Sequence, residues 1–544
     1  MKFLPASLRT YFKNDLLALF ALALVIRLLA ALPQQQPNYM DAAYSYVNAV
    51  NLAEGQGFVE DFVWNYLDDP APPPHPSHLY WMPLTSILAW LGMAIGGVSY
   101  RSAQISFIIL SAGLAPISYG VAYSVSGQRR HGWLAGLLAI FSGFYFPFWT
   151  AIDNFTPFAI AGSLALFLAW RGLEKHEPHK TGVRTHRLAI VAAGVWAGLA
   201  HLARADGPLL LIAIIAIGIF HLAFIKPATT HHVLSTTLYL LLGYMLIMTP
   251  WLSRNWLTTG RPLPIGGSQT IWLLTANDLF QSYAGLFSYG HELSAQTFFG
   301  QGLGPIIQGR WWALTANLQT VLAVWGMIFL APLALLGFWC LRHHLLMQLA
   351  GLYGLLLLVA MTFVFAFPGA LGGLFHSGTA LLPFIYAAGL VGLDNSVDWL
   401  AARRRHWHAP LAKRVFGLAL VMMAILLSGF IYYGRVLNHN AWNNVDLRYP
   451  AVAAWVAQQN PNATVMINNP PAYIYHGGGL SVVVPNEDIE TTLQAAHQYQ
   501  VDYLILDANR PAPLAEIYDQ TEAHPQLSLA KRFGSIHIFK IEQE

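Results

Sequence analysis

Residues 14–44 read NDLLALFALALVIRLLAALPQQQPNYMDAAY. The part from 14 to 32 is almost wholly apolar and is long enough to cross a hydrocarbon layer of about 30 Å. The polar stretch after it leads to Asp41, so the segment predicts a membrane-spanning helix followed by a carboxylate near the membrane surface. No small-residue cleavage site follows the apolar run, so we expect it to stay in the protein rather than act as a cleaved signal.

The whole chain has the same apolar character. Of its 544 residues, 56% are hydrophobic and 10% are charged, whereas soluble proteins carry about a quarter charged residues. This composition excludes a large soluble enzyme. The 29 Lys and Arg nearly balance the 26 Asp and Glu, which argues against nucleic acid as a partner. The single cysteine, Cys340, excludes an internal disulfide and a multi-cysteine zinc site.

Apolar runs of spanning length recur along the chain. The eleven predicted spans lie near 14–32, 102–125, 131–150, 157–170, 188–203, 207–225, 233–251, 316–340, 345–367, 376–393 and 415–434.

A further apolar segment, 78–97, could either cross the membrane or lie at its surface. If this segment does not cross the membrane, most Lys and Arg before residue 435 fall on one side of it, including the dense groups at 171–187 and 403–414. This distribution is the expected one, because Lys and Arg are enriched in cytoplasmic loops. Tyr80, Trp81 and Pro83 near its start suit a position at the membrane interface. We therefore predict an interfacial or re-entrant helix here, a cytoplasmic N-terminus and a long external first loop, 33–101.

After residue 434 the composition becomes more polar. Strand-like runs at 464–468, 481–485, 502–507 and 536–541 alternate with helical patterns at 447–459 and 488–499. This alternation predicts a small α/β domain at 435–544, outside the cytoplasm. The predicted fold class is thus mainly α: a polytopic membrane domain, 1–434, followed by a small extracytoplasmic α/β domain.

Asp41 is the first candidate catalytic residue. Asp41, Tyr44, Asn48 and Asn51 are spaced so that a helix would place them on one polar stripe. A carboxylate in a loop with few basic residues is suited to accept a proton from a substrate hydroxyl. It could instead cap a helix or be simply solvated.

Asp153 is the second candidate. It stands between two predicted spans with no other acidic or basic residue close by in the sequence, and an isolated acid near the bilayer is a functional-site candidate. It could instead cap the helix that begins near Pro157.

Two arginines are expected on the same external face. Arg204 with Asp206, and Arg254 with Asn255, lie at predicted span ends. Guanidinium groups at this depth suit a forked contact with phosphate, so we predict that these four residues bind substrate. Each arginine could instead reach out to lipid headgroups.

His75, His78 and Tyr80 open the predicted interfacial helix. The two histidines could bind a metal, but no third ligand lies nearby in the sequence, so we favour hydrogen bonding of these residues to a substrate.

Together these segments resemble the C-type integral membrane glycosyltransferases (GT-C), in particular the protein O-mannosyltransferase and aminoarabinose-transferase branch (glycosyltransferase family 39 and its relatives). The resemblance covers roughly residues 14–395. It rests on six short motifs: Asp41 with Tyr44, the stretch 75–81 (HPSHLYW), Asp153, Leu202-Ala-Arg204 with Gly207, the stretch 250–256 (PWLSRNW), and Leu381-Leu-Pro383.

The resemblance implies an enzyme whose catalytic base is Asp41 and in which Asp153 helps to hold donor or acceptor. It implies a polyprenyl-phosphate sugar donor, membrane lipid as surroundings, and a glycan, lipid or protein acceptor, in the plasma (inner) membrane. Among cofactors, only a divalent cation is a candidate.

The chain departs from the family pattern in three places. Ala42 stands where the family often has Glu, and His75-Pro-Ser-His78 replaces a Lys-Pro-Pro stretch. The stretch His376-Ser-Gly-Thr379 replaces a late Arg-Tyr before the Leu-Pro pair, and His376 is a further candidate substrate-binding residue. These departures leave the sugar, the mode of phosphate binding and the retention of activity open.

Two other functions use similar residues. A transporter or flippase of lipid-linked glycans would also place acids and arginines within the membrane. A non-catalytic glycan-assembly protein is the other alternative.

Overall fold

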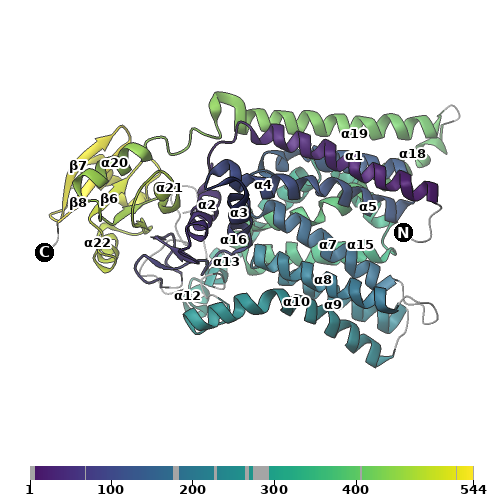
Figure 1. Cartoon of the computed structure of the whole chain (residues 1–544), viewed down its shortest axis with the longest axis horizontal. Helices are drawn as coiled ribbons and strands as arrows, with labels where there is room; N and C mark the ends of the chain where they lie inside the picture. The colour runs from purple at the N-terminus through teal and green to yellow at the C-terminus, as the bar shows by residue number, and fades with distance from the viewer. Residues whose placement is uncertain are drawn as a thin grey trace.

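The computed structural model has a bundle of long helices at one end and a β-sheet with short helices at the other (Figure 1). Helix α2 (Met40–Ala53) lies between these two parts. The structure describes residues 6–67, 69–174, 183–225, 229–263, 267, 269–273, 293–404, 407–521 and 523–542.

Nine helical segments of the described residues are long and apolar enough to span a membrane. They account for all but two of the eleven predicted spans, and they confirm a mainly α, multi-pass membrane protein. The nine segments contain α1 (Ala6–Ala31), α4 with α5 (Tyr100–Ala112, Leu114–Ser126), α7 (Phe155–Glu174), α8 (Val183–Ala203), α9 (Pro208–Phe220), α10 (Thr230–Thr259), α15 (Leu345–Val359), α18 (Leu382–Ala401) and α19 (Ala409–Tyr432).

The predicted span 131–150 is a broken helix. Helix α6 (Arg129–Ile140) stops, and a 3-10 helix, η1 (Gly143–Phe148), continues the path. Gly143 has φ +61° at the break, a backbone conformation that costs little only for glycine. Pro147 lies inside η1 and lacks an N–H for an α-helical ladder.

The predicted span 316–340 is broken as well. It covers the end of α13 (Leu303–Gln319), a π-helical turn, η4 (Thr320–Trp325), and α14 (Ala331–Cys340). Met327 and Ile328 between the last two have φ of +46° and +62°. Average hydropathy does not register such a break, because the residues that form it are themselves apolar.

The predicted interfacial helix 78–97 is present as α3 (Leu84–Gly96), which begins after Pro83. A helix of about 20 residues is needed to cross the bilayer, and α3 has 13. It packs closely on α4: a Cβ at Gly92 would lie 2.3 Å from the backbone oxygen of Ser102. This close approach holds the end of the first loop against the bundle.

The sheet has six strands in the order β2-β5-β4-β6-β8-β7. The four predicted strands appear as β4 (Val465–Ile467), β5 (Ser481–Val483), β6 (Tyr503–Leu506) and β8 (Ile536–Ile541), and the edge strand β7 (Leu527–Phe533) was not predicted.

The remaining strand of this sheet comes from the first loop. β2 (Phe62–Val63) pairs in parallel with β5, and the Ser481 N–H donates to the Asp61 carbonyl at 3.2 Å. Close by, β1 (Val59–Glu60) pairs with β3 (His75–Pro76). The sheet therefore extends beyond the predicted domain 435–544, whose boundary at 434 stays a prediction.

Helices cover both faces of the sheet. The predicted helices are present as α20 (Tyr449–Gln459) and α22 (Ile489–Gln498), and two short helices, α21 (Pro470–Tyr475) and α23 (Ala515–Asp519), were not predicted. α20 and α21 share one apolar core with the sheet, and α22 and α23 share another. Ala43 of α2 belongs to the first of these cores. Helix α2 is thus packed from the bundle side and from the sheet side.

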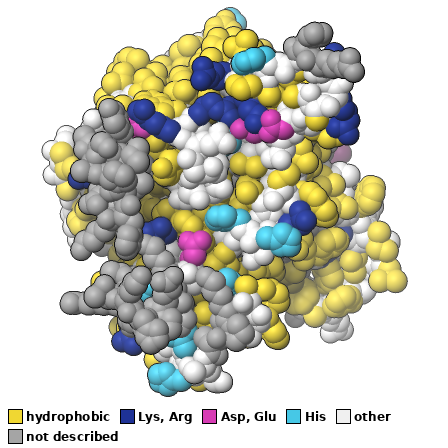
Figure 2. Space-filling view, turned by 90° about the vertical axis from the view of Figure 1, so that its right-hand side faces the viewer, with side chains coloured by type: hydrophobic (Ala, Val, Ile, Leu, Met, Phe, Trp, Pro, Cys, Tyr) yellow, Lys and Arg dark blue, Asp and Glu magenta, His cyan; other side chains and the backbone are white. Residues whose placement is uncertain are grey.

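Lys and Arg side chains gather on the end of the bundle that lies opposite the sheet (Figure 2). This distribution agrees with the predicted cytoplasmic side, and the orientation in the membrane stays a prediction. Several of the basic residues on which that prediction depends, Lys2, Lys175, Lys180, Lys226 and Arg405, lie outside the described residues.

We expect Trp442→Ala to destabilise the junction between the bundle and the sheet. Trp442 is 1% exposed, and its indole N–H donates to the Gln36 carbonyl at 2.9 Å. Loss of a buried indole costs about 3–5 kcal/mol, so the melting temperature in detergent should fall. Trp399, which is 59% exposed, is the control: Trp399→Ala should change the melting temperature little, and equal losses in the two variants would contradict the prediction.

Candidate functional site

Three segments that are distant in sequence bring two acids and a histidine together. Asp41 lies in the first turn of α2, Asp153 lies between η1 and α7, and His376 lies in the short helix α17 (Leu374–Ser377). One ligand atom of each residue lies within 4.8 Å of the others. The structure therefore places both predicted catalytic acids in one site.

Asp153 is held by two donors. It is 1% exposed, its Oδ2 accepts from the Tyr39 hydroxyl at 2.8 Å, and its Oδ1 accepts from the Asn154 backbone N–H at 2.5 Å. These two bonds fix the orientation of the Asp153 carboxylate. A residue that only caps the helix near Pro157 would not need the bond from the Tyr39 hydroxyl.

His376 is fixed by a hydrogen bond and by stacking. Its Nδ1 lies 2.7 Å from Asn154 Oδ1, and its ring stacks on Phe155 with 3.8 Å between centroids. Arg204 Nη1 donates to the same Asn154 oxygen at 3.3 Å. Because that atom accepts from Arg204, it must be the amide oxygen, so Nδ1 of His376 carries a hydrogen.

Arg204 and Asp206 form a small network with Ser377. The Arg204 Nε–H lies 3.1 Å from Asp206 Oδ1 and 2.7 Å from Ser377 Oγ. The Ser377 hydroxyl donates to the other oxygen of Asp206. The guanidinium is thereby aligned beside Asn154.

Four further residues of this site were not predicted from the sequence. Each lies close in sequence to a predicted site residue, and that proximity is the signal by which it could have been found. They are Tyr39, Asn154, Phe155 and Ser377.

Tyr44, His75 and His78 form a second group in the first loop. The Tyr44 hydroxyl accepts from the His78 backbone N–H at 2.9 Å. His78 Nε2 lies 2.9 Å from Ser86 Oγ, and His75 Nε2 lies 3.1 Å from the Phe62 carbonyl oxygen. Burial lowers the pKa of His78 to about 3, so its ring is neutral. These contacts hold the loop together, and binding of substrate by these residues stays a prediction.

The other predicted residues lie around the two groups. Tyr80 is close enough to interact electrostatically with Asp41 and Arg204. The Arg254 guanidinium donates to the Phe58 carbonyl and to Asn255 Oδ1, each at 3.1 Å. Asn255 is fully buried and donates to a loop carbonyl, which indicates a structural role. Arg254 forms no ion pair with any described residue, so its charge is available.

Burial and mutual repulsion dominate the electrostatics of the acids. Burial raises the pKa of Asp41 to about 6, and the positive charge of Arg204 opposes this shift. Burial and the negative charge of Asp41 raise the pKa of Asp153 to about 7. Two carboxylates so close together cannot both ionise freely, so the pair retains proton affinity near neutral pH.

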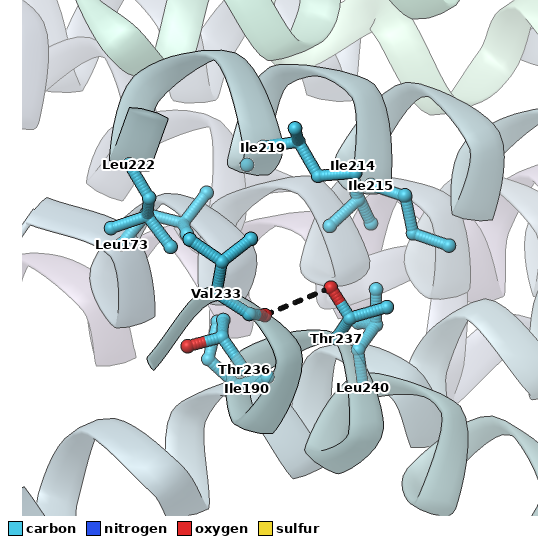
Figure 3. A pocket seen from close by; sticks show the side chains of 11 residues that line it. Leu173, Ile190, Ile214, Ile215, Ile219, Leu222, Val233, Thr236, Thr237 and Leu240 are labelled. Atoms are coloured by element: carbon cyan, nitrogen blue, oxygen red, sulfur yellow. Dashed lines mark hydrogen bonds between the residues drawn. The ribbon is translucent and has the colours of Figure 1, made fainter. Parts of the chain in front are cut away.

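An apolar pocket lies elsewhere, between α7, α8, α9 and α10 (Figure 3). Its lining includes Ile190, Ile214 and Leu240, and the Thr237 hydroxyl in it already donates to the Val233 carbonyl at 3.1 Å. The pocket has no charged lining residue and therefore lacks groups for catalysis.

No family model and no curated protein matches the sequence. Among solved structures, the archaeal oligosaccharyltransferase AglB from Archaeoglobus fulgidus, in complex with an inhibitory peptide and a dolichol-phosphate, has a TM-score of 0.55 and 13% identity over 91% of this chain and 69% of that chain. A crystal structure of the A. fulgidus oligosaccharyltransferase in complex with Zn and sulfate has a TM-score of 0.59 and 13% identity over 92% of this chain and 69% of that chain.

ArnT from Cupriavidus metallidurans, bound to undecaprenyl phosphate, has a TM-score of 0.56 and 13% identity over 96% of this chain and 97% of that chain. The chain therefore has the GT-C fold, and the resemblance predicted from the motifs is confirmed at the level of the fold.

We expect Asp41→Asn to stabilise the protein at high pH. The folded-state pKa of Asp41 is raised to about 6, so protonation favours folding, and this stabilisation is complete below the ordinary pKa of about 3.9 and is lost as the pH rises through 6. The variant should melt about 2 °C or more above the wild type at pH 8. The difference should shrink toward pH 4.5, with chelator present throughout.

Glu54→Gln is the matched control, since this acid is exposed at the end of the same helix. A melting-temperature difference for Asp41→Asn that is equal at both pH values would disprove the electrostatic interpretation.

Proposed function

We propose that this protein is a membrane glycosyltransferase. It moves a sugar from a polyprenyl-phosphate carrier to a hydroxyl of a glycan, lipid or protein acceptor on the extracytoplasmic face. The observation that carries the proposal is the close pair of the half-buried Asp41 and the buried Asp153 beside Arg204, on a GT-C fold. The similar structures contain dolichol-phosphate and undecaprenyl phosphate, which supports this class of donor.

Asp41 is the proposed base. A carboxylate is an efficient base when its pKa approaches the working pH, and burial raises the pKa of Asp41 to about 6. Asp41 is also half-buried, whereas Asp153 is 1% exposed and bonded to Tyr39 and Asn154. Asp41 is therefore the acid that a substrate hydroxyl can approach, and burial keeps its proton affinity high.

The proposed reaction is a single displacement. The acceptor oxygen bonds to the anomeric carbon, the bond from that carbon to the phosphate oxygen breaks, and the polyprenyl phosphate leaves with the electron pair. The acceptor proton passes to Asp41. One displacement inverts the anomeric centre and requires no carboxylate nucleophile.

Arg204 and Arg254 are the proposed phosphate-binding residues. Charge-assisted bonds from a guanidinium to phosphate are strong and directional. Arg254 has no carboxylate partner among the described residues, and Arg204 is aligned by Asp206 and Ser377. We assign Tyr44, His75, His78, Tyr80, Asn255 and His376 the supporting role of shaping the substrate site and holding its loops.

The proposed location is the plasma (inner) membrane with the sheet and the site outside the cytoplasm. The sheet lies at the end of the bundle opposite the Lys and Arg side chains of Figure 2, and such residues concentrate on the cytoplasmic side.

The donor set at the site also fits a divalent cation. Two carboxylates and an imidazole are ligands suited to Zn²⁺ or Mn²⁺, and their atoms lie within 4.8 Å of one another. Asp41 and Asp153 would hold the ion. The His376 nitrogen that lies 3.9 Å from Asp153 Oδ1 is Nδ1, so His376 would join them only if the Nδ1 hydrogen bond to Asn154 opened and Nδ1 gave up its hydrogen. When bound, such an ion would supply positive charge next to the donor phosphate.

We expect Asp41→Asn to lower sugar transfer by at least about a thousandfold, because the acceptor proton then has no carboxylate to accept it. The assay uses the protein in lipid nanodiscs with a labelled polyprenyl-phosphate sugar, and mass spectrometry of co-purified lipid identifies the donor. Wild-type activity should fall as the pH drops through about 6.

Glu54→Gln should retain full transfer in the same assay. Retained transfer by Asp41→Asn would refute the base assignment. Movement of intact donor between leaflets without cleavage would instead identify a flippase.

We expect Zn²⁺ or Mn²⁺ to raise the melting temperature of chelator-treated protein, since an ion that binds only the folded state stabilises it, by about 2.7 kcal/mol at a hundredfold excess over Kd. The rise should be larger at pH 8 than at pH 5.5, because protons compete for the carboxylates. Asp153→Asn should abolish the rise and Glu54→Gln should keep it. An equal rise in Asp153→Asn would place the ion elsewhere.

A further inference from the structure

Arg27 is a fully buried cation in helix α1, within a segment of spanning length. It forms no ion pair with any described residue, and its Nε and Nη1 find no hydrogen-bond partner there. An ionisable side chain at such a place requires a physical reason, because burying an unpaired charge is costly.

The hydrogen bond of Arg27 and its two aromatic contacts lie at the break between α6 and η1. Its Nη2 donates to the Ala139 carbonyl at 3.1 Å, and its guanidinium carbon lies 5.2 Å from the ring centre of Phe146 and 5.8 Å from that of Trp149. Both rings belong to the segment that follows the break, and an arginine over an aromatic face is attracted by it.

The Ala139 carbonyl needs this donor. In an unbroken helix it would accept from the N–H of Gly143, but that N–H donates to Ser428 Oγ at 2.9 Å instead. Carbonyls at the end of a helix also carry partial negative charge, which a cation stabilises. Arg27 thus replaces the bond that the break removes.

A second residue near the end of α1 holds the same segment. Gln34 is fully buried; its Nε2 donates to the Pro147 carbonyl at 2.7 Å, and its Oε1 accepts from the Thr150 hydroxyl at 2.7 Å. Asp153 lies three residues after Thr150 in the sequence, so Gln34 holds the chain just before Asp153.

We propose that Arg27 is a positioning residue for Asp153: it stabilises the end of α6 and so sets the path of residues 141–153 toward Asp41. The effect on catalysis rests on the proposed function. The effect of Arg27 on residues 141–153 does not rest on it, so an experiment can refute the proposed function without refuting the effect on this segment.

Hydrogen exchange tests the segment directly. Arg27→Met keeps the apolar volume but removes the donor and the charge, so amide exchange in residues 143–153 should rise about tenfold or more. Arg27→Lys, which keeps a charge and one bond, should restore much of the protection. Unchanged exchange in Arg27→Met would overturn the proposal.

The matched control lies at the other end of the same helix. Asp15 is also buried, and it binds Arg129 at 2.6 Å and Tyr119 at 2.8 Å. Asp15→Asn should lower the melting temperature without raising exchange at 143–153. An equal rise in this control would reduce Arg27 to a general stabiliser and would also overturn the proposal. If Arg27→Met does not fold, Gln34→Met perturbs the same segment.

The kinetic test separates positioning from stability. In folded Arg27→Met, kcat for sugar transfer should fall about a hundredfold while KM for the donor changes little, and Arg27→Lys should recover part of the loss. A wild type with normal protection but no transfer activity would refute the proposed function and leave the positioning of the segment intact. Full kcat in Arg27→Met despite faster exchange would overturn the positioning of Asp153.

Discussion

The pairing of β2 with β5 is the contact on which the arrangement of the site depends. This short parallel pair joins the first loop to a sheet whose other strands come from the last part of the chain. It fixes the middle of the loop and α1 precedes the loop, so that α2 is enclosed between the bundle and the sheet. The pairing thereby holds the segment that follows α2 against the sheet.

The site accepts an electrostatic cost. Two carboxylates share a largely buried volume, and the neighbouring cation, Arg204, is itself paired with Asp206. The hydroxyl of Tyr39 and the backbone of Asn154 offset part of the cost by donating to Asp153. An arrangement optimised for stability alone would separate the acids, so their proximity is best explained by a need for strong proton or cation affinity at this position.

The sequence predicted the features that depend on composition and local pattern. Nine of the eleven spans, the interfacial helix and four of the sheet strands follow from runs of apolar residues and their period. The break after α6 could not be predicted, because its stabilising contacts come from Arg27 and Ser428, far away in sequence. Strand β7 was not predicted, because it is an exposed edge strand that contains Lys531 and Arg532. Its sequence therefore lacks the alternation of apolar residues that indicates a strand.

The residues of the site were likewise predictable only where the sequence itself carries a signal. Asp41, Asp153 and Arg204 could be selected because charges are scarce in this chain. Asn154 and Ser377 carry no such signal, since amides and hydroxyls are common and their role arises only when α7 and α17 meet.

The origin of β2 also has a consequence for the order of biosynthesis. Roughly 420 residues separate Val63 from Ser481, and at about 5–20 residues per second their synthesis takes on the order of 20–80 s. Throughout that time β2 has no strand partner, because β5 has not yet been made. The region around Asp41 therefore completes its structure after the rest of the membrane bundle has been made, and a chain that ends early never assembles this part of the protein.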